Sequence, residues 1–79
     1  MQGYAWAQYG LGFMYNYGRG VPESDVEAYA WVNIAADQGV QLAKKVREPI
    51  AETMTRENMF RAQKLSREYW KAYVLPFRD

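Results

Sequence analysis

The residue types on which most enzymes depend are missing from this sequence. It contains no histidine and no cysteine, which removes the commonest general base, the thiolate nucleophile and the usual zinc ligands. Carboxylates remain, and Glu23, Asp25 and Glu27 lie close together. They stand where a helix is expected to begin, and acidic side chains are favoured there by exposed backbone N–H groups and the helix dipole. We therefore expect helix capping, no catalytic residue and no enzyme activity.

Two glycine pairs, Gly10-x-Gly12 and Gly18-x-Gly20, have the spacing seen in parts of phosphate-binding loops. Neither follows a strand pattern, and the chain lacks both the Gly-Lys-Ser/Thr and the three-glycine fingerprints of nucleotide sites. We expect no nucleotide, no metal, no other cofactor and no small-molecule substrate.

Basic side chains gather near the end of the chain, at Arg56, Arg61, Lys64, Arg67 and Lys71. A basic helix is one signature of nucleic-acid binding, so a small basic helical nucleic-acid-binding protein is the alternative function. However, Glu57 lies four residues before Arg61 and Glu68 lies three before Lys71, which is the spacing of ordinary surface ion pairs. The pattern favours a solvated helix face.

The two halves of the chain differ in charge. Residues 1–39 hold one base and four acids, whereas residues 40–79 hold nine bases and five acids. This asymmetry suits head-to-tail association or an acidic partner, and it equally suits amphipathic helices whose charges face water.

The first eighteen residues lack the features of a targeting or membrane segment. No lysine or arginine precedes Arg19, and Gln8 and several glycines interrupt the apolar stretch. We expect a soluble protein with no membrane partner. The compartment is not determined, and the cytoplasm is favoured if the chain is complete.

Small and apolar residues recur at helical spacing, and no run alternates with a period of two. This predicts an all-α chain of about four helices. The first is expected over about residues 3–17, ending at Gly18 and Gly20. The second begins with a capping box in which Ser24 and Glu27 satisfy each other's backbone donors, and it ends at Gly39.

The third expected helix follows residue 39 and contains Pro49. Because proline lacks a backbone donor and disfavours helical geometry in the preceding residue, we expect a kink or short break there. Thr55 is the expected N-cap of the fourth helix, which should run to about Tyr73.

A weak internal repeat relates the two halves. Gly3 and Ala7 recur as Gly39 and Ala43, and Ala28-x-x-Trp31 recurs as Ala62-x-x-Leu65. We infer antiparallel helix-turn-helix repeats of an α/α solenoid in one domain, residues 1–79, with a full repeat at 1–39 and a degenerate second unit or C-terminal capping helices at 40–79.

The small and aromatic residues of the first unit follow a distinctive order: Ala7-Gln8, Leu11-Gly12, Tyr15, Gly18-x-Gly20-Val21, Asp25, Ala28, Trp31, Ala35-Ala36 and Gly39. In this order residues 5–39 resemble a Sel-1-like repeat, and the stretch from Ala43 to Leu65 resembles the capping segment of that family. The family is similar to tetratricopeptide repeats, which act as protein adaptors and are generally not enzymes. The resemblance implies a protein-protein interaction module whose packing positions are Ala7, Leu11, Gly12, Tyr15, Ala28, Trp31, Ala35 and Ala36.

The first helix is expected to be apolar on two faces. A helical wheel places Trp6, Tyr9, Phe13 and Tyr17 on one face, and Tyr4, Ala7, Leu11, Met14 and Tyr15 on the other. One neighbouring helix covers only one of them. The four rings Trp6, Tyr9, Phe13 and Tyr17 are therefore candidate protein-binding residues, although a later helix folding back over them would make them ordinary core.

The partner cannot be named from the sequence. Because the resemblance shows no repeat before the first helix, a second copy of the chain is the favoured partner, as a homodimer, and an unknown protein is the second candidate. The pathway, the oligomeric state and whether this is a whole protein or part of a longer one remain open at this point.

Overall fold

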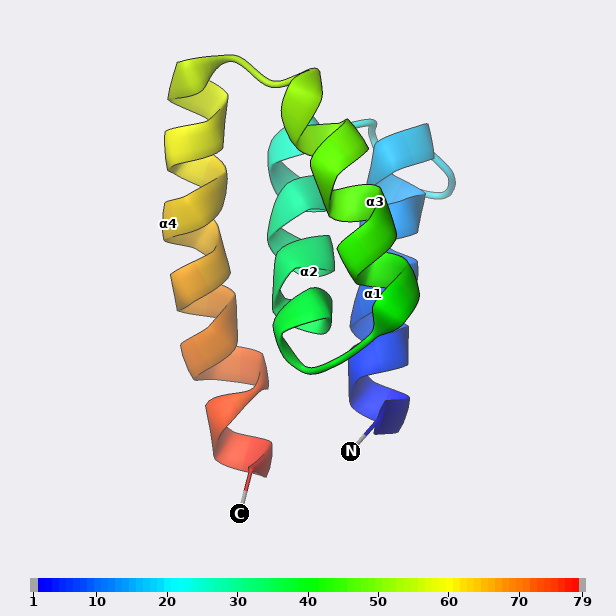
Figure 1. The fold of residues 1–79 in the computed structure, drawn as a ribbon, viewed down its shortest axis with the longest axis vertical. Coiled ribbons are helices and arrows are strands. Elements are labelled where there is room, and N and C mark those ends of the chain that lie inside the picture. The colour runs from blue at the N-terminus through cyan, green and yellow to red at the C-terminus, as the bar shows by residue number, and fades with distance from the viewer. Residues whose placement is uncertain (1, 79) are drawn as a thin grey trace.

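Four α-helices and a short 3₁₀ turn make up residues 2–78, the part of the chain that the structure, a computed structural model, describes. The helices are α1 (Gln2–Tyr17), α2 (Asp25–Asp37), α3 (Gln41–Glu52) and α4 (Arg56–Tyr73), followed by η1 (Leu75–Phe77). Successive helices run in opposite directions, so that α1 begins and η1 ends at the same end of the molecule (Figure 1). The all-α, tetratricopeptide-like fold predicted from the sequence is confirmed.

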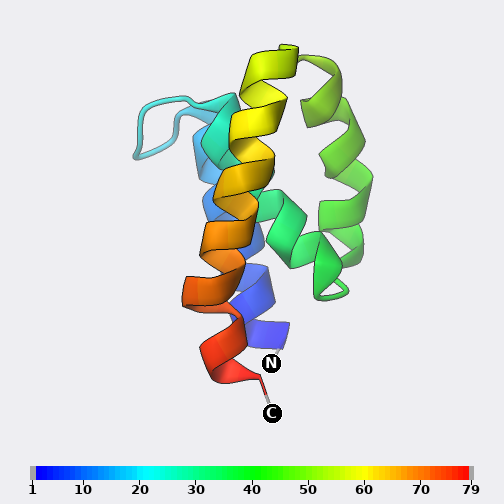
Figure 2. The same ribbon diagram turned by 90° about the vertical axis from the view of Figure 1, so that its left-hand side faces the viewer.

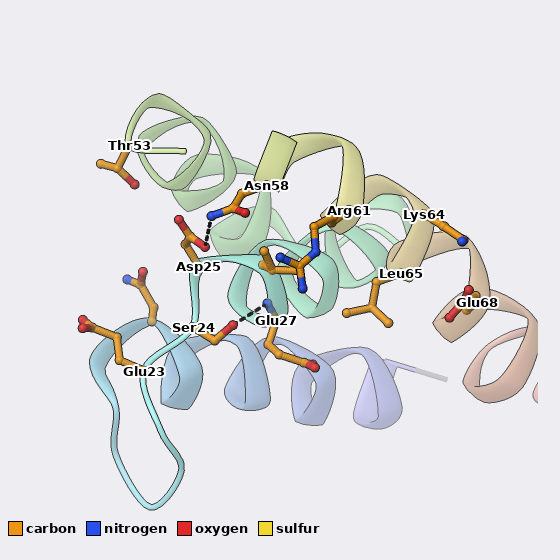
Figure 3. A pocket seen from close by; sticks show the side chains of 12 residues that line it. Glu23, Ser24, Asp25, Glu27, Thr53, Asn58, Arg61, Lys64, Leu65 and Glu68 are labelled. Atoms are coloured by element: carbon orange, nitrogen blue, oxygen red, sulfur yellow. Dashed lines mark hydrogen bonds between the residues drawn. The ribbon is translucent and has the colours of Figure 1, made fainter. Parts of the chain in front are cut away.

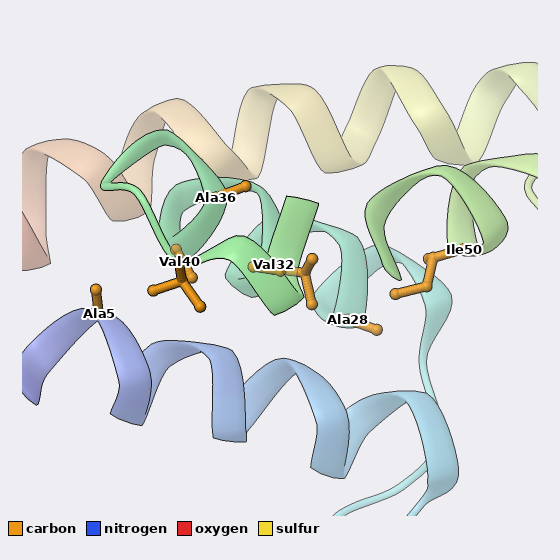
Figure 4. Packing of buried hydrophobic residues seen from close by; sticks show 8 residues of the cluster. Ala5, Ala28, Val32, Ala36, Val40 and Ile50 are labelled. Atoms are coloured by element: carbon orange, nitrogen blue, oxygen red, sulfur yellow. The ribbon is translucent and has the colours of Figure 1, made fainter. Parts of the chain in front are cut away.

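Helix α2 is the centre of the fold, because α1, α3 and α4 all pack against it (Figures 1 and 2). Its buried positions are mostly small, which lets the neighbouring helix axes approach closely. The main core joins α2 to α1 and α3 through Ala5, Ala28, Val32, Ala35, Ala36, Val40, Ala43 and Ile50 (Figure 4). A second cluster joins α2 to α4, where Trp31 stacks on Tyr69 with ring centroids 4.3 Å apart.

The helix ends lie where glycines were expected to close them. Gly18 and Gly39 have positive φ angles of 65° and 100°, a conformation that favours glycine. After α1, the backbone N–H of Arg19 donates to the carbonyl of Met14 at 2.9 Å. After α2, the N–H of Val40 donates to the carbonyl of Ala35 at 3.2 Å. Both bonds satisfy carbonyls that the helix itself leaves free.

The N-terminal cap of α2 differs in part from the expected capping box. The Ser24 hydroxyl accepts a bond from the Glu27 N–H at 3.2 Å, as predicted. The reciprocal bond is replaced, because the Ser24 N–H donates to the carbonyl of Tyr15 at 3.0 Å. The Glu27 carboxylate accepts instead from the Tyr69 hydroxyl at 2.7 Å. The residue that was expected to close the cap thus ties α2 to α4.

A kink or a short break was expected at Pro49, and the short break is wrong, because helix α3 continues through the proline to Glu52. Pro49 lies in the last turn of the helix, where it removes one hydrogen bond only, and Ile50 beside it is buried against the core. The next helix begins as predicted, since the Thr55 hydroxyl accepts from the Asn58 N–H at 3.0 Å.

The buried face of α1 is rotated from the expected one. Ala5, Gln8 and Gly12 face α2, whereas Ala7, which the family resemblance placed at a packing position, is exposed. Gln8 is only 5% exposed, and its amide is satisfied because it donates to the Tyr73 carbonyl and accepts from the Gln38 side chain. This polar residue can therefore lie inside, which no apolar pattern indicates.

Candidate protein-interaction surface on helix α1

Three aromatic side chains of α1 are exposed on the side opposite its buried stripe, which consists of Ala5, Gln8 and Gly12. Trp6 is 45% exposed, Phe13 42% and Tyr17 60%. The rings lie in pairs along the helix, with Trp6 edge-on to Tyr9 at 5.8 Å and Phe13 tilted against Tyr17 at 4.7 Å between centroids. Within each pair the two rings contact each other in a geometry that aromatic side chains favour.

Tyr9 belongs partly to the core. It is half-buried and packs against the main core cluster. With Phe13 and Tyr17 it lines a small pocket of about 140 Å³ that Val46, Pro49 and Ile50 of α3 close on the other side. Tyr9 therefore has the burial expected of a core residue, whereas Trp6, Phe13 and Tyr17 are exposed. Their role in protein binding stays a prediction.

The whole of α1 is uncharged. The first charged side chain of the sequence is Arg19, so every acidic and basic residue lies after this helix. A helix of 16 residues in water usually carries charge on its outer face. Here the outer face carries the exposed rings Trp6, Phe13 and Tyr17 instead, and aromatic side chains are enriched at protein interfaces.

The comparison with protein families fits this arrangement. A family model described as the Sel1 repeat matches residues 7–40, which cover most of α1, the connecting loop and α2. Residues 7–40 are a Sel1 repeat. Sel1 repeats are tetratricopeptide-like interaction modules and are generally not enzymes. Comparison with curated proteins and with solved structures gives no match.

A second, polar groove lies between α4 and the helix pair α1 and α2. It is an open groove of about 950 Å³ lined by Asn16, Glu23, Ser24, Asp25, Val26, Glu27, Thr53, Asn58, Arg61, Lys64, Leu65 and Glu68 (Figure 3). Asp25 accepts a long bond of 3.5 Å from the Asn58 amide, and Glu27 is held by Tyr69. Burial raises the pKa of the Tyr69 phenol above its ordinary value of 10.0, and the bond to Glu27 raises it further.

The basic residues of α4 do not form an uninterrupted cationic surface. Arg61 and Lys64 line the polar groove together with Glu23, Asp25 and Glu68. This groove therefore contains both acidic and basic side chains, whereas a phosphate backbone needs a basic stripe. In the part of the chain that is described, no helix has the length and apolarity needed to cross a membrane.

Two glycines on the surface of α1, Gly3 and Gly10, were not among the candidate site residues predicted from the sequence. An added Cβ at Gly3 or Gly10 meets no atom within 4 Å, so both face open space. Gly12 is different, because a Cβ there would lie 2.6 Å from Val32 Cγ2. The missed signal is the spacing of Gly3 and Gly10 relative to Trp6 and Phe13, which places all four on one side of the helix.

Proposed function

We propose that this chain is a protein-protein interaction module that self-associates through the outer face of α1, with Trp6, Phe13 and Tyr17 as the anchors and Tyr9 at the edge. The supporting observation is the exposure of three large rings on a helix without a single charge. Aromatic side chains lose little conformational entropy on docking and are enriched at the centres of protein interfaces.

The absence of charge favours a second copy of the chain as the partner. In a two-fold symmetric interface each surface meets itself, so any charge near the axis is opposed by a like charge. The outer face of α1 pays no such penalty. The basic and acidic residues that would repel across the axis all lie beyond Tyr17.

The association is expected to be weak. A fully buried aromatic ring removes about 150–250 Å² from water, so three half-exposed rings offer on the order of 250 Å² per copy. This is well below the roughly 800 Å² per partner of a standard stable interface. We expect a dimer that dissociates in the micromolar range, which makes a dilution series informative.

Charge introduced on the α1 face tests the proposal. The double variant Trp6→Glu/Phe13→Glu is expected to be monomeric by light scattering at concentrations where the wild type is dimeric, with an unchanged helical circular dichroism spectrum. Tyr9 is avoided because it contacts the core. The matched control is Phe60→Glu on α4, where the ring is 66% exposed, and it should keep the wild-type mass.

Two results would overturn self-association. One is a wild type that stays monomeric at every concentration reached. The other is a double variant that remains folded and keeps the dimeric mass.

A further inference from the structure

The outer face of α1 carries a regular seam. Gly3, Trp6, Gly10, Phe13 and Tyr17 follow one another at steps of three and four residues. This is the spacing of the a and d positions of a coiled coil, where one helix faces another along its length. Along this seam, glycines and aromatic rings alternate over the first four positions.

Among the described residues, no packing contact requires a glycine at position 3 or 10 of the seam. Gly12 is required, because α2 leaves no room for a Cβ there. Gly3, in the first turn of α1, and Gly10, in its interior, both face open space. Glycine is among the least favourable residues in a helix interior, so Gly10 in particular calls for an explanation. A close-packed neighbour outside the chain would explain Gly10 and would use Gly3 in the same way, since glycine lets a large side chain of a second helix approach the backbone.

We propose that the α1 helices of two copies pack antiparallel along this seam, with the two-fold axis level with residue 8 and each glycine opposite a ring of the other copy. In antiparallel helix pairs the a position of one helix lies beside the d position of the other. Gly3 of one copy then faces Phe13 of the other, and Gly10 faces Trp6. The pair then has four layers, each made of one seam residue from each copy. Every layer holds one glycine and one ring, so no layer is overfilled or empty.

Other registers fit less well. A parallel pair brings each position beside its own copy, so rings meet rings at Trp6 and Phe13 while glycines leave voids. An antiparallel pair shifted by one heptad places Trp6 against Tyr17 and leaves Gly3 unpaired. The seam carries no charge, so the antiparallel pair meets no repulsion across the axis. Tyr17 lies beyond the paired segment, at the rim.

This inference rests on the proposed self-association, and disulfide trapping tests the register separately. The chain has no cysteine of its own. A mixture of Gly3→Cys chains and Phe13→Cys chains, oxidised above the dimer dissociation constant, is expected to give a covalent dimer containing one chain of each kind. Either variant alone should stay uncrosslinked, because the two copies of one position lie roughly 15 Å apart or more along an antiparallel pair, beyond the reach of a disulfide.

The cross-linking results separate the two proposals. If the protein is dimeric but each variant cross-links with itself and not with the other, the helices are parallel and the register is wrong while self-association stands. If the wild type is monomeric, both proposals are overturned.

Exchanging a ring and a glycine tests the packing of the layers. Gly10→Trp alone places two rings in each of the two layers that pair residues 6 and 10, and it should raise the dissociation constant at least about tenfold. The double variant Trp6→Gly/Gly10→Trp has the composition of the wild type and again pairs one ring with one glycine in those layers, so it should restore the dissociation constant to near the wild-type value. A single variant that binds normally, or a double variant that is no better than the single one, would refute the size-matched layers.

Discussion

Gly12 and Gly10 stand two residues apart on α1 and should respond to the same substitution in opposite directions. A Cβ on Gly12 would lie 2.6 Å from Val32 Cγ2 and 3.1 Å from both the Ala28 carbonyl oxygen and the Val32 nitrogen. Two of these atoms belong to the backbone of α2, so a change of the Val32 rotamer would still leave two tight contacts. A Cβ on Gly10 meets nothing within 4 Å.

The magnitudes follow from two opposing effects. Replacing glycine by alanine inside a helix stabilises it by about 1 kcal/mol. Overpacking a tight contact costs about 1–3 kcal/mol, and the larger values apply where backbone must move. We expect Gly12→Ala to lower the free energy of unfolding by about 1–2 kcal/mol after this offset, and Gly10→Ala to raise it by about 0.5–1 kcal/mol.

Both variants should be measured in a Phe13→Glu background, because Gly10 also lies on the proposed dimer seam. Urea unfolding followed by circular dichroism at low protein concentration then reports on the single chain. For a domain of this size, 1 kcal/mol corresponds to a shift in melting temperature of roughly 4–8 °C. If Gly12→Ala were as stabilising as Gly10→Ala, the close approach of α1 and α2 would be wrong.

Two further substitutions test the turn after α2 and the link between α2 and α4. Gly39→Ala should lower the free energy of unfolding by about 1–2 kcal/mol in urea titrations, because a φ of 100° is strained for a residue with a Cβ, and an unchanged midpoint would contradict this geometry. Since burial and Glu27 raise the folded-state pKa of Tyr69 above 10.0, its contribution to stability is complete below pH 10 and is lost as the pH rises beyond it. Tyr69→Phe should therefore reduce the fall in stability measured between neutral pH and pH 11, and an identical pH profile in the variant would show that Tyr69 is not responsible.

The helix ends could be predicted because their signals are local. Gly18 and Gly39 supply the left-handed backbone that closes α1 and α2, and Ser24 and Thr55 accept bonds from the N–H groups three residues later. The second half of the capping box could not be predicted. It depends on Tyr69, which lies 42 residues away from Glu27 in the sequence.

The rotation of α1 was the main feature that the sequence did not determine. Charged residues usually mark the solvent face of a helix, and α1 has none. Gln8 looks like a surface residue, yet Tyr73 and Gln38 satisfy its amide inside the fold. Three of the four candidate anchors are nevertheless exposed, because Trp6, Phe13 and Tyr17 lie opposite the buried stripe, whereas Tyr9 lies at its edge.

Sedimentation equilibrium of the wild-type chain over a dilution series tests self-association through α1 most directly. Its formula mass is 9.2 kDa. We expect the weight-average mass to fall from about twice this value to the monomer value as the protein is diluted through the micromolar range, and the Trp6→Glu/Phe13→Glu variant to give the monomer mass throughout. A wild type with the monomer mass at every concentration would contradict the proposal.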